Sequence, residues 1–354
     1  MGLGAVVVLT VERETGVYAG KDGQQKPLVV QPLGCVDVMG RPMVERTIDH
    51  LRDAGVGKVT LLTSKDIVRN CPSIANRLDQ VKVKFVDDPG SAVNEVLNRY
   101  AEEGIEHAFV LAENVYAETD LLDFVYFHRE AKKGITRAFD HEGPLDLWVV
   151  DCDRYSRFDL EKMGASDGDA ASYFIAGYVR RLLHPGDLRA IIADSLGGVC
   201  AMRPSGQEVR PGIWVDEGAE IDRRARIVAP AYIGCNSKVR EDALVTRCSS
   251  VERDCCIDFG TIVEDSSILA NTRVGIWLDV RHAVASGNKL VSLKHDVLLE
   301  IADPNVMRFN SMLAKEEGKD RSESRERVVQ PVVSKIKPET APETWQLGAN
   351  LIQG

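Results

Sequence analysis

The sequence predicts an α/β domain with a Rossmann-like, mainly parallel sheet, followed by a parallel β-helix. Strand and helix patterns alternate through the first 150 residues, which is typical of a parallel sheet covered on both faces. From residue 215 onward, β-branched residues recur every six positions, a period typical of a β-helix. The chain of 354 residues is long enough for two domains of ordinary size.

The predicted elements of the first domain follow one another closely along the chain. Strands are expected at 5–9, 58–64, 81–88 and 107–113, and helices at 41–55, 91–104 and 121–134. The apolar residues of 41–55 lie near one helical face, and Gly55 ends the segment. The segments 172–183 and 187–196 are also expected to be helical and to complete the domain.

The six-residue period runs without error from Val215 to Val263, slips by one residue, and resumes at Ile268. The twelve positions are Val215, Ile221, Ile227, Ile233, Val239, Val245, Val251, Ile257, Val263, Ile268, Val274 and Val280. A small residue stands two before each position from Ile221 on, with Leu278 as the exception, because that site faces a tight corner. Three units close one triangular coil, so the series gives about four coils. Each buried Ile or Val contributes roughly 1.5–3 kcal/mol.

These patterns divide the chain into three parts. Residues 1–212 form the α/β domain, residues 213–293 form the β-helix, and residues 294–354 form a C-terminal extension. The extension is mostly polar, mixed in charge and weakly periodic, so we expect it to be largely flexible.

Composition and charge argue against several classes of binding partner and indicate the cellular location. The formal net charge of −10 argues against a nucleic-acid or anionic-membrane partner. No apolar run approaches 18 residues, and the start lacks the basic leader of an export signal, so we expect a cytoplasmic protein without a membrane partner. The eight cysteines include no C-x-x-C pair, which argues against a zinc-binding cysteine framework.

Two families are similar to parts of this chain. The repeat resembles the left-handed parallel β-helix of hexapeptide-repeat proteins. The segments MGRPMVERTIDHLRDAGVGKVTLLTS (39–64) and HAFVLAENVYAETDLLDFVYFHREAKKG (107–134) resemble the nucleotidyltransferase domain of sugar-nucleotide pyrophosphorylases. The resemblance implies attack by a sugar 1-phosphate on a nucleoside triphosphate, with release of pyrophosphate. It also implies nucleotide-sugar metabolism that supplies polysaccharide biosynthesis, and homo-oligomers formed through the β-helix.

That chemistry needs backbone N–H groups to bind phosphates, a cation to stabilise their charge, and carboxylates to hold Mg²⁺. The loop after the first strand, LTVERETGVYAGKDG (9–23), has dispersed glycines, and Glu12 and Glu14 would repel a triphosphate. By resemblance, the nucleotide-binding candidates in it are Thr10, Gly16, Gly20 and Gly23.

The cation and the metal ligands also depart from the pattern of the pyrophosphorylase family. Leu33 stands in register with the family's lysine, so Lys26 is the best remaining catalytic cation. Glu113 and Asn114 stand where the family has a Gly-Asp pair, and they are the metal candidates if the enzyme is active. Asn114 offers Mg²⁺ a neutral oxygen without a charge.

The residues leave several functions open. A degenerate relative would bind a nucleotide or sugar nucleotide, or would act as a scaffold or regulator, without a cofactor. An active sugar-1-phosphate nucleotidyltransferase would need Mg²⁺. A hexapeptide-repeat acyltransferase would need a histidine base, for which His282 and His295 are the candidates near the end of the coils.

Overall fold

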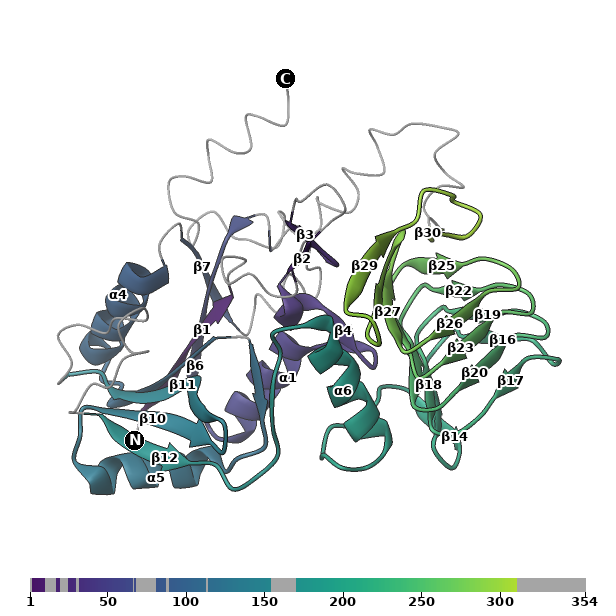
Figure 1. The fold of residues 1–354 in the computed structure, drawn as a ribbon. Coiled ribbons are helices and arrows are strands. Elements are labelled where there is room, and N and C mark those ends of the chain that lie inside the picture. The colour runs from purple at the N-terminus through teal and green to yellow at the C-terminus, as the bar shows by residue number, and fades with distance from the viewer. Residues whose placement is uncertain are drawn as a thin grey trace.

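The structure is a computed structural model, and it shows an α/β lobe beside a stack of short strands (Figure 1). The α/β lobe holds the N-terminal part of the chain, and helix α6 lies between this lobe and the stack (Figure 1). The structure describes residues 2–9, 17–19, 25–29, 32–65, 67, 81–86, 89–112, 114–153 and 170–310.

A seven-stranded sheet forms the centre of the first lobe, in the order β12-β10-β11-β8-β1-β6-β7. Among these described strands, β11 alone runs against the others, so the prediction of a mainly parallel sheet is confirmed. The strands are β1 (Leu3–Leu9), β6 (Lys58–Thr63), β7 (Lys82–Phe85), β8 (His107–Ala112), β10 (Ile135–Asp140), β11 (Gly143–Asp151) and β12 (Ala171–Phe174).

Helices cover both faces of this sheet because its central strand is apolar on both sides. On one face, α1 (Met43–Asp53) and α5 (Leu121–Ala131) share a core with Val7 and Leu9 of β1. On the other face, α4 (Pro89–Glu102) packs against Val6 and Val8 of the same strand. Alternate residues of β1 therefore pack against the helices on the two faces of the sheet.

The segment 172–183 was predicted to be helical, and that prediction is wrong. Its residues form the end of β12 and the strand β13 (Val179–Arg181), which pairs with β9 (Val115–Ala117). The apolar spacing in SYFIAGYVRRLL fits a helix, but pairing with β10 and β9 overrides that local pattern. The helix predicted at 187–196 is present as α6 (Pro185–Leu196).

The repeat segment forms three further sheets, one for each side of a coil. The first holds β14 (Gln207–Arg210), β15 (Ile213–Val215), β18 (Ala231–Ile233), β21 (Ser249–Val251), β24 (Ser267–Ile268), β27 (Ala283–Ser286), β28 (Lys289–Ser292) and β29 (Val297–Glu300). The second holds β16 (Glu220–Ile221), β19 (Lys238–Val239), β22 (Cys256–Ile257), β25 (Thr272–Val274) and β30 (Met307–Phe309). The third holds β17 (Arg226–Ile227), β20 (Leu244–Thr246), β23 (Ile262–Glu264) and β26 (Asp279–Arg281).

The register of the parallel pairs shows how the six-residue period builds this stack. Val215 pairs with Ile233, and Ile233 with Val251, so each of these coils takes eighteen residues. Val251 then pairs with Ile268, and Ile268 with Ala285, which shortens the coil to seventeen residues. The slip in the sequence is therefore a loss of one residue at a corner, with the stacking of strands unchanged.

The small residues two before each apolar position do more than avoid a clash. The Ser237 hydroxyl donates a hydrogen bond to the carbonyl of Glu252 at 2.6 Å, and it accepts one from the N–H of Cys255 at 3.0 Å. The Ser249 hydroxyl accepts from the N–H of Ser266 in the same way, at 3.1 Å. Buried hydroxyls therefore satisfy backbone groups at a corner where no strand pair does so.

The two lobes share one apolar core. Its members come from the first lobe, from α6 and from the coils, and they are Leu28, Val36, Val38, Met39, Met43, Leu182, Leu188, Ile191, Ile192, Cys200, Met202, Tyr232, Leu269, Val284 and Val291. Ion pairs also join the two lobes. Arg253 pairs with Asp37 at 2.5 Å, and Arg189 of α6 pairs with Asp265 at 2.5 Å. The lobes are therefore packed together over apolar and charged contacts.

Short elements complete the described chain. They are β2 (Val17–Ala19), β3 (Gln25–Pro27), the 3-10 helix η1 (Leu33–Cys35), β4 (Asp37–Val38) and β5 (Arg41–Pro42). The strands β29 and β30 belong to the predicted C-terminal extension, and Met307 of β30 lies in the core of the coils. Residues 311–354 of that extension lie outside the described residues.

Candidate functional site

The carboxyl ends of the parallel strands mark the edge where sheets of this kind bind ligands. Strands β1, β6 and β8 end there at Leu9, Thr63 and Ala112. Five of the residues predicted for the site, in the loop after β1 and directly after β8, lie outside the described residues. They are Thr10, Gly16, Gly20, Gly23 and Glu113.

Lys26, the predicted cation, lies in the two-stranded sheet of β2 and β3, where its backbone pairs with Tyr18. The next residue, Pro27, accepts a hydrogen bond at 2.9 Å from the ammonium group of Lys289 on β28. This hairpin therefore contacts the C-terminal strands of the stack. None of the described contacts links Lys26 to Asn114, and the side chain of Lys26 is outside the described residues.

Asn114 lies at the turn after β8, as the sequence predicts, but its amide is bound to a neighbouring carboxylate. Its Nδ2 donates to Oδ2 of Asp146 at 2.9 Å, while Oδ1 of Asp146 contacts Nη2 of Arg137 at 3.3 Å. Arg137 is held by a bond from Nε to the carbonyl of Leu145 at 2.8 Å, and its guanidinium lies over the ring of Trp148.

The described residues of this corner already bind one another, and Glu113, the predicted carboxylate ligand, lies outside the described residues. Mg²⁺ prefers oxygen ligands, and the carboxylate of Asp146 accepts a hydrogen bond on one oxygen from an amide and pairs on the other with a guanidinium. The remaining amide oxygen, Oδ1 of Asn114, is buried and has no partner among the described residues. Glu118, a nearby carboxylate, accepts hydrogen bonds from the Tyr116 hydroxyl and the N–H of Ala201.

A pocket of about 520 Å³ opens beside this corner, between α1, the end of β8 and residues 201–203. Three arginines, four carboxylates and an apolar floor line it. Two of the arginines are Arg41 and Arg203. The carboxylates are Asp49, Asp53, Glu118 and Asp146, and the floor includes Leu111, Val115, Leu147 and Met202. Arg203 holds its guanidinium by bonds from Nη1 to the carbonyls of Cys200 and Met202, at 3.0 and 3.2 Å.

Arg46 is the third arginine of the pocket, and it ties the pocket to the boundary between the lobes. Its guanidinium donates to the carbonyls of Val38 and Arg203, at 2.8 and 3.1 Å, and burial lowers its pKa. No pattern in the sequence indicates this pocket, because its arginines come from two segments that are far apart in the chain.

The histidines considered for acyl transfer lie near the end of the coils. Nδ1 of His282 contacts Oδ2 of Asp265 at 2.5 Å, and the imidazole is about half exposed at the surface of the corner. His295 is exposed beyond β28. Neither lines this pocket of about 520 Å³.

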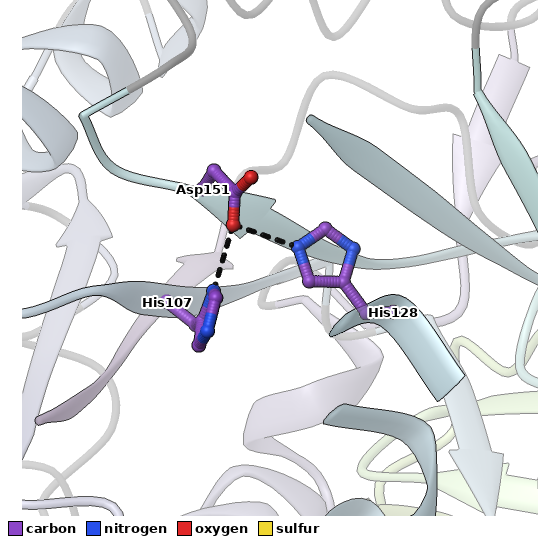
Figure 2. Close-up of side chains that lie close together, drawn as sticks. All are labelled: His107, His128 and Asp151. Carbon is purple, nitrogen blue, oxygen red and sulfur yellow. Dashed lines mark hydrogen bonds and ion pairs between the residues drawn. The ribbon is translucent and has the colours of Figure 1, made fainter. Parts of the chain in front are cut away.

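A second cluster was missed by the sequence reasoning. His107, His128 and Asp151 meet at the opposite edge of the sheet, where β8 begins and β11 ends (Figure 2). Their separations in the chain follow no metal-binding motif, and only the pairing of His107 with Asp151 across the strands brings them together. Of the three elements, only the strand that begins at His107 and the helix that holds His128 were predicted, so the sequence did not place Asp151 beside them.

No helix in the described part of the chain has both the length and the apolar character that crossing a membrane requires. Searches found no match among known protein families or curated proteins. Among solved structures, the chain is similar to HddC from Yersinia pseudotuberculosis at 14% identity and a TM-score of 0.37, over 52% of this chain and 95% of that one. HddC complexed with GMP-PN is similar at 14% identity and a TM-score of 0.38, over 53% and 96% of the two chains.

Proposed function

We propose that this chain is a degenerate nucleotidyltransferase-like protein of nucleotide-sugar or polysaccharide metabolism. In this proposal it binds a nucleotide or sugar nucleotide without metal-dependent nucleotidyl transfer. The proposal also takes the stack of coils as a left-handed β-helix through which copies of the chain associate, and it takes the chain as cytoplasmic. The parallel register of seventeen and eighteen residues supports the β-helix.

One observation carries the loss of transfer activity. Among the described residues, the side chain of Asn114 at the predicted metal corner is bonded to Asp146, whose two oxygens contact Asn114 and Arg137. Both charged side chains are largely buried, so the ion pair is only weakly screened by water. A divalent cation would have to displace a guanidinium from this carboxylate and would gain only a neutral amide from Asn114.

The pocket beside this corner supports binding. Arg203 and Arg41 line it, and an arginine binds phosphate oxygens through paired N–H groups. Arg41 is paired with Asp49 and Glu45, so a phosphate would share its guanidinium with these carboxylates. Leu111, Val115 and Leu147 give an apolar floor on which a base or sugar ring can rest. Under this proposal the loop from Thr10 to Gly23 and Lys26 contribute further phosphate contacts from the same edge.

The test combines binding with turnover. The full chain is melted with a panel of nucleoside triphosphates and nucleotide sugars, each with and without Mg²⁺, and pyrophosphate release is assayed with sugar 1-phosphates. We expect stabilisation by one ligand class that does not depend on Mg²⁺, and no pyrophosphate. A ligand at 100 times its dissociation constant stabilises by about 2.7 kcal/mol, which a melting shift reveals.

Arginine variants locate the binding. Replacing Arg203 with Gln removes a charge-assisted contact worth about 1.5–3 kcal/mol, so affinity should fall tenfold or more. The matched control is Arg210→Gln, an exposed arginine on β14 outside the pocket. Release of pyrophosphate with Mg²⁺ would show an active enzyme instead. Absence of binding across the whole panel would favour a scaffold.

A further inference from the structure

At the far edge of the sheet, two imidazoles approach one carboxylate oxygen, and the three side chains come from three different elements. Nδ1 of His107 lies 2.8 Å from Oδ1 of Asp151, and Nε2 of His128 lies 3.0 Å from the same oxygen (Figure 2). His107 opens β8, Asp151 closes β11, and His128 comes from α5. The three potential ligand atoms lie within 4.8 Å of one another.

We propose that His107, His128 and Asp151 form a binding site for a transition-metal cation, with Zn²⁺ as the best match. Two imidazole nitrogens and one carboxylate oxygen are a common set of protein ligands for zinc with an open fourth position. The hard cations Mg²⁺ and Ca²⁺ prefer a shell of oxygen atoms, so this donor set disfavours them.

The geometry needs little adjustment to admit the ion. Tetrahedral zinc with bonds of about 2.0–2.1 Å keeps its ligand atoms about 3.3 Å apart. The two nitrogen–oxygen distances, 2.8 and 3.0 Å, are slightly shorter than that. Small rotations of the three side chains would open them, and the cation would replace the hydrogen atoms that now join the imidazoles to Asp151.

The surroundings of His128 favour its role as a ligand. Its other nitrogen, Nδ1, lies 2.7 Å from the hydroxyl of Thr136 on β10, which fixes the ring so that Nε2 faces Asp151. His128 is almost fully buried, so its ring has little freedom to turn away from Asp151.

A cavity of about 400 Å³ gives the ion access and room for a fourth ligand. Besides the three ligands, its walls carry two acidic side chains, Glu106 and Asp153, and three basic ones, Arg129, Lys132 and Lys133. The acidic groups offset part of the charge of the cation. The basic groups favour water or a small anion, and disfavour a second cation, in the fourth position.

This site is separate from the pocket of the proposed function. It lies at the edge where β8 begins, whereas the nucleotide pocket lies where β8 ends. A metal here would join α5 to the β8–β11 pair and so stabilise the lobe. The inference does not depend on nucleotide binding, because a chain without a working nucleotide site would still hold the three ligands together.

The test is a titration of the full chain, freed of metal by a chelator, with Zn²⁺ and with Co²⁺. We expect one equivalent of Zn²⁺ to bind and to raise the melting temperature. The Co²⁺ complex should show bands of nitrogen and oxygen ligation without a thiolate charge-transfer band. A thiolate band would overturn the proposal, because it would place the metal on cysteines.

Two variants and a control keep the test decisive. Asp151→Asn keeps the shape and hydrogen bonds of the cluster but removes the charge, and His107→Gln removes a ligand from its more exposed side. Each should weaken Zn²⁺ binding at least tenfold, with circular dichroism showing that the variant is folded. His141→Gln alters an exposed histidine of the same lobe and should change nothing. Equal binding by all four proteins, or no binding by the unaltered chain, would overturn the proposal.

Discussion

The backbone N–H of Gly40 donates a hydrogen bond at 2.9 Å to Oε2 of Glu252, across the boundary between the two lobes. The other carboxyl oxygen, Oε1, accepts from the N–H of Met39 at 2.9 Å. A side chain of the coils therefore binds the turn that starts α1. Burial, followed by repulsion from Asp37, raises the pKa of Glu252 to about 8.

This carboxyl makes stability depend on pH. The pKa of Glu252 is higher in the folded chain than in the unfolded one, so its contribution is complete below about pH 4.5 and is lost as the pH rises through about 8. We expect the free energy of unfolding to fall by at least about 1 kcal/mol between pH 5 and pH 8. Denaturant unfolding at each pH measures this slope.

The control for that slope is Glu252→Gln, whose side chain is neutral at every pH. The Gln amide has one oxygen acceptor where the carboxyl of Glu252 has two, so one backbone N–H at the turn loses its partner. At pH 5 the variant should therefore be less stable than the unaltered chain by about 1–3 kcal/mol. The difference between the two proteins should narrow toward pH 8. Parallel slopes in both proteins would place the titrating group elsewhere.

Gly40 should tolerate no side chain. Its φ is +86°, and an added Cβ would lie 2.3 Å from the hydroxyl of Tyr232 and 2.8 Å from Cβ of Ser205. Gly55 has a similar φ of +81° but open space around it, so Gly55→Ala reports the backbone strain alone. We expect Gly40→Ala to cost at least about 2 kcal/mol more than Gly55→Ala in thermal or denaturant unfolding. Equal costs would mean that the turn moves away from Tyr232.

Ser237 should contribute to stability through its hydroxyl. Ser237→Ala leaves the carbonyl of Glu252 and the N–H of Cys255 without this buried partner. We expect a loss of about 1–3 kcal/mol in the free energy of unfolding. Ala243 occupies the equivalent place in the neighbouring sheet, so Ala243→Ser is the reciprocal variant. A neutral Ser237→Ala would show that neighbouring groups take over both bonds.

Asn114→Asp should restore a dependence on Mg²⁺. The new carboxylate would lie beside Asp146, at the position of an amide now 2.9 Å away, and the two charges would repel. Without metal the variant should melt below the unaltered chain, and millimolar Mg²⁺ should restore much of the difference. Asn305→Asp, at an exposed position, should respond to neither. If Mg²⁺ left the melting temperature of the variant unchanged, the guanidinium of Arg137 would be balancing the negative charge of both carboxylates.

The sequence was most informative where a period is repeated. Ile233, Val245 and Ile257 are fully buried inside the coils, as their spacing predicts, because every coil imposes the same environment on them. It was least informative where distant segments meet. Nothing near Glu252 indicates that its carboxyl will be buried against the turn at Gly40, since only the packing of the lobes makes that contact.

The candidate sites also combine features that the sequence predicts with features that only tertiary pairing creates. The turn holding Asn114 was found because it follows a predicted strand, but its bond to Asp146 depends on an antiparallel neighbour, β11, that the pattern did not show. His107, His128 and Asp151 meet for the same reason. Both side-chain clusters of this lobe thus depend on a strand, β11, whose direction is set by tertiary pairing.

Coils of eighteen and seventeen residues differ in length at one corner of the stack. In the longer coil the corner holds two residues with positive φ, Arg247 and Cys248, whereas in the shorter coils one suffices, Asp265 or His282. Losing a residue inside a strand would turn its interior side chains outward. Losing one at this corner leaves them in place, so insertions and deletions can accumulate along a single edge while the interior is inherited unchanged.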